Sequence, residues 1–502
     1  MHRALIIPEI AFGIVAQIPD DKKQILLSLA LAGGEFQKPA LDALWRDPGP
    51  DVPHHILKCF PPGVFALSFS STGSRRLKVN LLRPPLPDEL KRPSDYCKRV
   101  KRFCLGPNVD KYKDPLSVLS MLLPAEHLFP HRLHFSHTPP PSLTWLKFSG
   151  RNLNVVLLST LAAALLKPGA PRLRRVSFAG QLSSPLSEGE CAAVSLFLRS
   201  LQHITHLHLP SAKDQDLFHL SQLSRLKSLQ LDAFPATYIP DAVLDHLASE
   251  CPFPFLSKLK LSQASLHAVC QLVPLVADTL RSLGVQPDPL STSADICALF
   301  DTIAEHVPTS LLEFTIRCKP APTGEDDRWK ISSKDLAALY YSAGLTTVSI
   351  STRSGFDGLC DNTLRTMAES WCRLTSLCLV QDQMSSATTQ LALQSLVFLA
   401  DNCLLLESLA VAVSTTVIPA TPADRVVQPT LRTLDVGFSR ITDVFGVTRF
   451  LSATFPGIRE VKNKWGFAVD NAVRWKQVSD WVPRLAIVRR EEQRCGCLSG
   501  MD

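Results

Sequence analysis

The sequence predicts an α/β solenoid, with parallel strands on its inner face and helices on its outer face, preceded by a small all-α module. The first observation is a short pattern that recurs about twelve times: an apolar residue, two others, an apolar residue, one other and an apolar residue. The second is that the segments between its copies have helical periodicity. The third is a set of three short amphipathic segments before residue 48, which predicts the module.

The repeated pattern describes a strand. In the copy at residues 173–178, Val176 and Phe178 are two positions apart and therefore share one strand face. The copies recur about every 29 residues, at the long end of the range for leucine-rich repeats. Because no single strand–helix unit can bury its own apolar face, the stack is the expected folding unit. The copies begin at Leu143, Leu173, Ile204, Leu226, Leu256, Leu280, Leu311, Leu345, Leu374, Leu406, Leu431 and Ile458.

The segments between the strands are expected to be helices on the outside of the stack. Apolar residues spaced three and four apart predict them at 153–166, 293–306, 361–371 and 390–402, and a further helix is expected to begin near Ser187. The inward strand positions are expected to be buried; examples are Leu229, Leu259, Leu377 and Leu434. Several helices lead into the next strand through a cysteine, a placement that resembles the cysteine-containing subclass of intracellular leucine-rich repeats; these are Cys251, Cys372 and Cys403.

Composition indicates a folded protein of a reducing compartment. The 502 residues are 45% hydrophobic and 20% charged, and the net charge of +7 is too modest to argue for nucleic acid. The 14 cysteines are scattered singly, as expected of buried free thiols. No apolar run reaches the length of a membrane span. Pro8 and Glu9 interrupt the apolar N-terminus, so we expect no export and place the protein in the cytoplasm or nucleus.

No enzyme signature is present, which predicts a non-catalytic protein without a cofactor. The motifs G-x-S-x-G, H-E-x-x-H, G-x-x-x-x-G-K-[ST] and G-x-G-x-x-G are all missing from the sequence. His203, His206 and His208 could hold a metal, but no carboxylate or thiol stands at a fitting spacing, so a partner contact is preferred. The basic run 98–102 could bind phosphate groups or act as a nuclear address, although a solvated face explains it better.

The first 47 residues predict three short helices. Pro8 suits the first turn of a helix, and Glu9 favours its positive end. Ile10, Ile14 and Ile18 then recur at four-residue spacing and form one apolar face. A module this small is marginally stable alone and usually needs a partner surface.

The second and third helices of the module have their own boundary signals. Asp20 and Asp21 can open the second helix, and Gly33 and Gly34 end it. The third helix carries Trp45 and stops at the sequence Asp-Pro-Gly-Pro, residues 47–50.

These residues resemble an F-box. The segments 7–10, 29–32, 36 and 39–46 are similar to the F-box of the large fungal, mushroom-type group of F-box and leucine-rich-repeat proteins. Segments 56–61, 96–103, 474–478 and 486–489 are also similar to that group. The resemblance implies that the module docks on the Skp adaptor and, through it, on a cullin. The residues implied in adaptor binding are Ile7, Pro8, Glu9, Ile10, Ile14, Leu26, Leu29, Phe36 and Trp45.

The remaining chain divides by composition and repeat. A proline-rich connector is expected over 48–94 and the leucine-rich-repeat solenoid over 95–465, its first repeat being irregular and beginning with the pattern at 100–105. A C-terminal cap is expected over 466–490, with Trp475 and Trp481 and the nearby Trp465. A polar tail follows over 491–502, where Cys495 and Cys497 are expected to be free thiols in disordered chain.

The repeat phase also predicts which residues line the concave face. In the first half these are basic: Lys147, Arg175, His206, His208, Lys258 and Lys260. A face of one charge sign is where repeat proteins usually bind, although solubility alone also places charges there. Together with the F-box resemblance, this favours a substrate-recognition subunit of a Skp–cullin–F-box ubiquitin ligase that holds a target protein. The alternative is a leucine-rich-repeat scaffold that is not assembled into a ligase.

Overall fold

The computed structural model describes residues 7–19, 21–49, 51–69, 77–100, 102–105, 145–149, 162, 173–179, 188–212, 214–234, 238–249, 252–307, 309–318, 331–352, 355–381, 391–419, 427–464 and 470–498. The chain divides into two compact units, Met1–Asp232 and Ala233–Asp502. Both units combine helices with parallel strands, which confirms the α/β class.

The first unit opens with the three expected helices, α1 (Pro8–Ala16), α2 (Lys23–Ala32) and α3 (Gln37–Arg46), with the short turn η2 (Gly34–Phe36) between the last two. Gly33 and Gly34 have φ values of 74° and 59°, which side chains with a Cβ rarely adopt, so glycine here ends α2. Val15, Leu26, Ala30 and Ala40 form the core of this module. Partly buried apolar residues pack around that core: Ile18, Leu29, Phe36, Leu41, Ala43 and Leu44.

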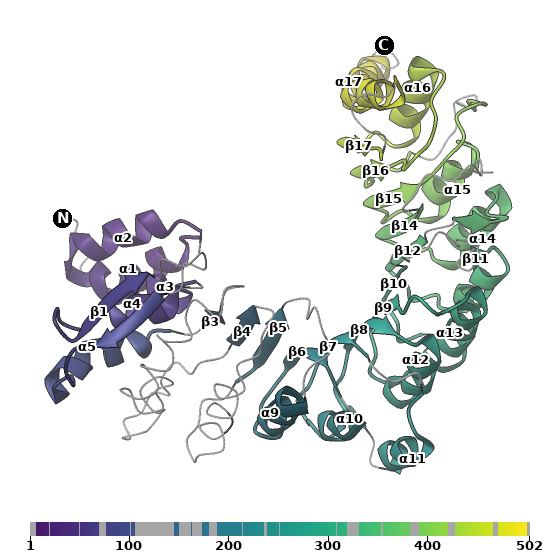
Figure 1. The fold of residues 1–502 in the computed structure, drawn as a ribbon. Coiled ribbons are helices and arrows are strands. Elements are labelled where there is room, and N and C mark those ends of the chain that lie inside the picture. Colours follow the sequence, from purple (N-terminus) through teal and green to yellow (C-terminus); the bar gives the residue numbers. More distant parts are fainter. Residues whose placement is uncertain are drawn as a thin grey trace. The chain divides into compact units, whose positions relative to one another are not determined.

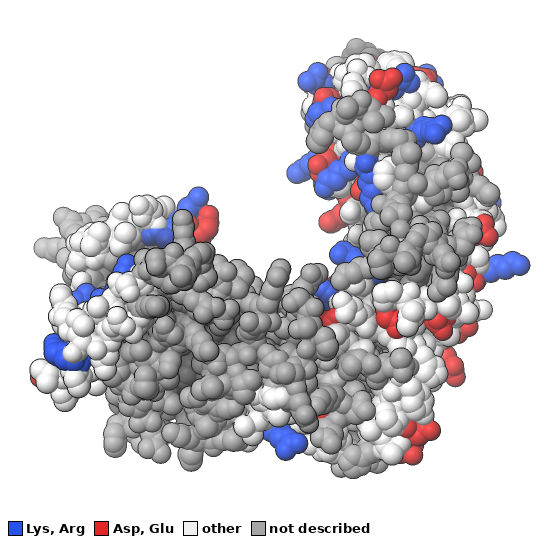
Figure 2. Space-filling view, viewed as in Figure 1, with Lys and Arg blue, Asp and Glu red and all other residues white. Residues whose placement is uncertain are grey.

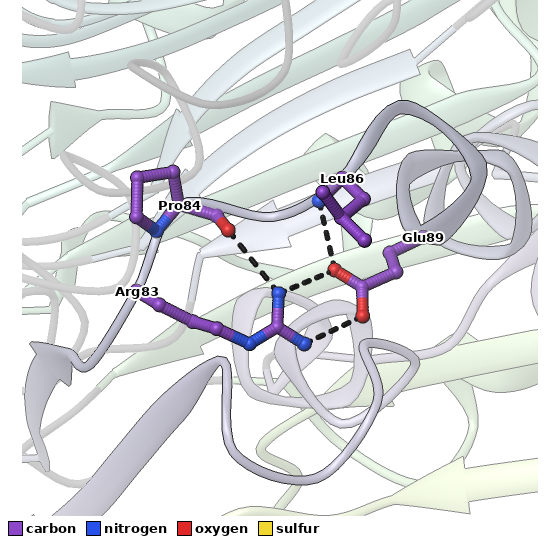
Figure 3. A network of polar contacts seen from close by, with 4 residues as sticks. All are labelled: Arg83, Pro84, Leu86 and Glu89. Carbon is purple, nitrogen blue, oxygen red and sulfur yellow. Dashed lines mark hydrogen bonds and ion pairs between the residues drawn. The ribbon is translucent and has the colours of Figure 1, made fainter.

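The segment expected as a proline-rich connector instead contains regular elements. They are α4 (Val52–Leu57), the antiparallel strands β1 (Phe65–Phe69) and β2 (Leu77–Leu81), and α5 (Pro87–Cys97). Arg83, which precedes α5, forms a two-point ion pair with Glu89 in the first turn of that helix (Figure 3). Glu89 also accepts a hydrogen bond from the Leu86 N–H at 2.8 Å. Prolines therefore begin helices here, at Val52-Pro53 and Pro87, rather than keeping the chain irregular.

A parallel sheet follows in the first unit. Its strands are β3 (Arg102–Leu105), β4 (Trp145–Ser149), β5 (Arg175–Ala179), β6 (His206–Ser211) and β7 (Ser228–Ala233), adjacent in that order. The pairs β3–β4, β4–β5 and β5–β6 are parallel. In the sequence, helix α9 (Glu188–Arg199) connects β5 to β6, and helix α10 (Asp214–Ser221) connects β6 to β7. The sheet thus begins at the pattern 100–105, as the sequence predicts. The expected helix at 153–166, apart from residue 162, lies outside the described residues.

The second unit repeats the alternation of strand and helix. Its parallel strands run in the order β8 (Lys258–Ala264), β9 (Ser282–Pro287), β10 (Glu313–Arg317), β12 (Thr347–Thr352), β14 (Ser376–Gln381), β15 (Ser408–Val411), β16 (Thr433–Asp435) and β17 (Glu460–Lys462). The helices are α11 (Asp241–Ser249), α12 (Leu266–Leu272), α13 (Ser293–His306), α14 (Asp361–Ser370), α15 (Ser395–Asn402), α16 (Val444–Thr454) and α17 (Asp470–Leu498), with short turns η4 (Pro274–Val276) and η6 (Asp335–Tyr341). A separate parallel pair joins β11 (Ile331–Ser332) to β13 (Phe356–Asp357).

In the second unit the helices lie on one face of the large sheet, and no described helix covers the opposite face (Figure 1). Residues alternate between buried and accessible along each strand, as in β9, because successive side chains point to opposite faces. The buried set includes Leu229 in the first unit and Leu259, Leu377 and Leu434 in the second, as predicted from the repeat phase. We call the face that carries the accessible set the open face.

Two helix boundaries differ from expectation. The helix predicted over 390–402 begins only at Ser395, because Leu391 and Leu393 enter the core in a segment that forms a bridge at Ala392 and then a turn. Helix α17 continues to Leu498, so residues 491–498 are helical, and the disordered chain expected around Cys495 and Cys497 is wrong. Trp475 on α17 is fully buried and donates to the Ser439 carbonyl at 2.8 Å, whereas Trp481 is exposed. Trp465, which was expected near the cap, lies outside the described residues.

The sequence also predicted buried free cysteines and no membrane-spanning segment. Cys59, Cys97, Cys318 and Cys403 are buried free thiols, and burial raises the pKa of Cys97 to about 12. Cys372 is exposed, so not every thiol is sheltered. In the part of the chain that the structure describes, no helix combines the length and the apolar character needed to cross a bilayer.

Candidate functional site

An exposed apolar surface on α1 and α2 is the first candidate site. Ile7, Ile10 and Ile14 recur at helical spacing, and each is between 37% and 45% exposed. Ala11 and Val15, on the neighbouring side of the same helix, are buried in the module. Helix α1 therefore has one apolar stripe for its own core and a second that faces solvent.

Helix α2 carries the same surplus of apolar residues. Leu26 and Ala30, four positions apart, supply its core contact. Ile25, Leu27 and Leu31 are exposed, Leu31 by 77%. A helix that is apolar on nearly all sides is usually covered by more than its own domain. We define the N-terminal apolar surface as Ile7, Ile10, Phe12, Ile14, Ile25, Leu27 and Leu31; the region over α1 and α2 in Figure 2 is largely free of charged atoms.

The structure separates the residues that the resemblance implied in adaptor binding. Ile7, Pro8, Glu9, Ile10 and Ile14 are exposed. Leu26 is only 2% exposed and packs with Val15, Ala30 and Ala40, so it stabilises the module and is not an accessible contact. Leu29 and Phe36 are partly buried against the same core.

Trp45 lies against the following segment rather than with the exposed stripe. Its ring centroid is 4.6 Å from that of Tyr96 and 6.5 Å from that of His55. Asp42 on α3 forms an ion pair with Arg99, just after α5. Helix α3 therefore packs against α5, and the half-buried Trp45 contributes to that contact, while its implied role in adaptor binding stays a prediction. The sequence analysis did not select the exposed residues Phe12, Ile25, Leu27 and Leu31. Each is an apolar residue outside the helix face that packs in the core, and that pattern could have indicated them.

The open face of the first unit carries the next set of predicted residues. Arg175 is in register with His206, and Ser177 with His208 and Lys147; the Lys147 side chain lies outside the described part. His208 Nε2 lies 2.8 Å from Asp232 Oδ2, and its Nδ1 lies 3.0 Å from the Ser177 hydroxyl. The expected basic strip is thus interrupted by an acidic partner.

His206 does not add a firm positive charge. Burial, followed by the nearby Arg175 and Lys227, lowers its pKa below the ordinary value, so the imidazole is neutral at neutral pH. No group of three or more His, Cys, Asp or Glu side chains fit to hold a metal occurs among the described residues.

In the second unit Lys258 and Lys260 project from β8 on the open face, as expected, and both are exposed. Lys258 Nζ lies 3.8 Å from Glu313 Oε2, and Glu313 also accepts from the Ser282 hydroxyl at 2.7 Å. Lys260 extends past Gly284, where the absence of a side chain leaves room for its stem. The carboxylate on β10 therefore offsets one of the two predicted ammonium groups.

Two cations at the carboxyl ends of the strands were not predicted. Arg317 ends β10, and Lys464 follows β17 and donates to the Gln381 carbonyl at the end of β14, at 2.9 Å. Both act electrostatically on Cys378 of β14. Arg317 stands one position beyond the repeated apolar pattern, and Lys464 reaches β14 only through the folded chain, so the repeat phase alone did not select them.

A comparison of the chain with models of known protein families finds no match, and a comparison with curated protein sequences finds none either.

Proposed function

We propose that this protein is the substrate-recognition subunit of a Skp–cullin–F-box ubiquitin ligase. In this proposal the N-terminal helices dock on the Skp adaptor, and the repeated strand–helix units hold a target protein. The observation that carries the proposal is the N-terminal apolar surface, which a small module exposes although its own core is already complete. The F-box resemblance of the same helices supplies the identity of the partner.

We further infer that the strand–helix units form a leucine-rich-repeat solenoid. The strands are adjacent in sequence order within each unit, and the leucines of the repeated pattern are buried beneath them. Because the pattern recurs regularly, equivalent apolar residues of neighbouring strands lie side by side, as Phe314 does with Leu283 and Val348. Each such unit depends on its neighbours for burial, which suits an extended binding surface.

The proposed mechanism needs no chemistry from this chain. A receptor that holds a target and an adaptor together raises the effective concentration of the target beside the ubiquitin-carrying enzyme. The residues required are those that bind, so the expected phenotype of a damaged surface is lost capture rather than a slowed chemical step.

The experiment is capture of a purified fungal Skp adaptor by the full chain. The double substitution Ile10→Asp with Ile14→Asp places two charges on the exposed stripe, and Leu290→Asp is the matched control on an exposed leucine of the second unit. Burial of a large apolar side chain is worth roughly 1.5–3 kcal/mol when complete. The double variant should therefore lose tenfold or more of the affinity while the control keeps it.

The alternative, a repeat scaffold outside any ligase, predicts a different outcome. Wild type, double variant and control would then all capture equally little adaptor. Circular dichroism of the double variant must match wild type, because the substituted side chains lie outside the module core.

A further inference from the structure

The carboxyl ends of the strands in the second unit bring two cations to one place. Arg317 from the end of β10 and the ammonium group of Lys464 at the end of β14 lie on the two sides of β12. Burial, and to a smaller extent the negative charge of Asp435, raise the pKa of the Cys378 thiol, while a hydrogen bond with Ser349 and the positive charges of Lys464 and Arg317 act in the opposite direction. Both cations, and the Asp435 carboxylate, are therefore within electrostatic reach of Cys378.

Between these cations the open face is built from short side chains. The in-register row that crosses β10, β12, β14 and β15 contains Thr315, Ser349, Cys378 and Ala410. No member of that row extends beyond its γ atoms, so the backbone of another chain could approach the sheet closely. The hydroxyl groups can donate to an acceptor lying across the strands.

Charge on the open face of the second unit varies along the strands. Toward the carboxyl ends stand Arg317 and Lys464, whereas Lys260, Asp435 and Lys462 lie in the same in-register row as Cys378. Toward the amino ends, Lys258 is offset by Glu313, and Glu460 pairs with Lys462 at 3.2 Å. Figure 2 shows Lys and Arg atoms on the strand side of this unit, with Asp and Glu atoms among them. Among the described residues, no carboxylate forms an ion pair with Arg317.

Two amide donors add to the polar character of these strand ends. The side-chain nitrogens of Gln286, on β9, and Gln381, on β14, are buried, and neither has a hydrogen-bond partner among the described residues. Gln286 follows Val285, which is in register with Ile316, so it lies beside Arg317 along the sheet. A buried donor without an acceptor is costly.

We propose that the carboxyl-end surface, defined as Gln286, Arg317, Ser349, Cys378 and Lys464, binds an extended acidic segment of a target protein. That the bound segment belongs to a ligase target rests on the proposed function. The binding of an acidic peptide is argued from the residues of this surface alone. The guanidinium of Arg317 can take a carboxylate side chain in a two-point contact, while Lys464 takes a second carboxylate farther along the peptide. The short side chains between these two cations leave room for the peptide backbone.

The spacing favours a peptide rather than a compact anion. Arg317 and the Lys464 ammonium lie at the ends of β10 and β14, which are separated by β12, and strands in a sheet are about 4.8 Å apart. Two cations about two strand spacings apart match carboxylates on different residues of an extended chain better than one small anion.

The test is fluorescence anisotropy of the full chain with a short fluorescein-labelled peptide of alternating glutamate and serine. The matched probes replace each glutamate with glutamine, or replace the glutamates with alanine and phosphorylate the serines. Arg317→Gln is the primary variant, because no described carboxylate pairs with it. Arg373→Gln is the control, since this exposed arginine precedes β14 at the amino end of the strand.

Wild type should bind the glutamate peptide and not the glutamine peptide, and binding should weaken as salt is added. Arg317→Gln together with Lys464→Gln should lower the affinity roughly three- to tenfold, given the modest worth of each exposed ion pair, whereas Arg373→Gln should leave it unchanged. Equal binding by all variants, or binding of the phosphorylated peptide alone, would overturn the proposal. Adaptor capture is measured separately, so a chain that binds the peptide but no adaptor would contradict the proposed function and not this inference.

Discussion

Arg83 and Glu89 are joined at two points: Nη2 lies 2.6 Å from Oε1 and Nη1 lies 2.8 Å from Oε2 (Figure 3). The same carboxylate accepts from the Leu86 N–H at the start of α5, so one side chain both caps the helix and holds the chain that enters it. The Arg83 hydrogen bond, followed by the Leu86 N–H, lowers the pKa of Glu89 from 4.5 to about 2.

This pairing predicts a pH dependence. Because the pKa of Glu89 is depressed in the folded state, its contribution to stability is present above 4.5 and is lost as the pH falls toward 2. The urea midpoint of Glu89→Gln should lie below that of wild type at about pH 7, and the gap should narrow at about pH 3. The effect should be small, since the pair is solvated. A gap that stays constant or widens toward acid would contradict the assigned cause.

The core of the N-terminal module gives a second prediction. Leu26 is 2% exposed and Leu31 is 77% exposed on the same helix. Leu26→Ala should reduce the free energy of unfolding of the module by about 2–5 kcal/mol, whereas Leu31→Ala should change it by less than about 0.5 kcal/mol. Amide hydrogen exchange of α1 to α3 in the full chain measures both. Similar protection losses in the two variants would show that the helices pack differently.

A third prediction concerns the parallel sheet. Leu377 is fully buried on β14, while Leu404, in the turn before β15, is 55% exposed. Leu377→Ala should cost about 2–5 kcal/mol because it leaves a cavity between the sheet and the helices. Leu404→Ala should be close to neutral. Urea unfolding monitored by circular dichroism distinguishes the two, and an unchanged midpoint for Leu377→Ala would refute the assigned packing.

The C-terminal helix provides the fourth prediction. Trp475 is fully buried and its Nε1 donates to the Ser439 carbonyl, whereas Trp481 is 40% exposed. Trp475→Phe should destabilise the second unit by about 1–3 kcal/mol, the cost of a lost buried hydrogen bond. Trp481→Phe should have little effect. Thermal unfolding of the full chain compares them, and equal shifts would show that the hydrogen bond contributes nothing.

Predictions from the sequence were correct where a periodic apolar pattern corresponds to buried residues. The spacing of Leu259 and Leu261 indicates one strand face, and both residues are fully buried on β8. The helix over 293–306 was predicted to the residue from the spacing of its apolar residues, and Thr292 and Asp295 cap its start reciprocally.

Where it failed, the deciding contact was long-range. Nothing local to Trp45 indicates that its ring will stack on Tyr96, and nothing near Lys464 indicates that its ammonium group will reach the Gln381 carbonyl. Leu26 was assigned to a docking surface because the family resemblance marks apolar positions without saying which of them the module needs for its own core. The connector over 48–94 was described only by its proline content, which does not reveal its helices; Pro87 in fact starts one, because proline suits the first turn of a helix.

The most direct test of the account is hydrogen exchange of the full chain with and without a purified fungal Skp adaptor. If the N-terminal apolar surface is the docking site, peptides that cover α1 and α2 should become protected at saturating adaptor, while those that cover β8 to β17 should not change. Protection should disappear in Ile10→Asp with Ile14→Asp and persist in Leu290→Asp. Unchanged exchange across α1 and α2, or protection confined to the parallel sheet, would contradict the claim that this surface receives the adaptor.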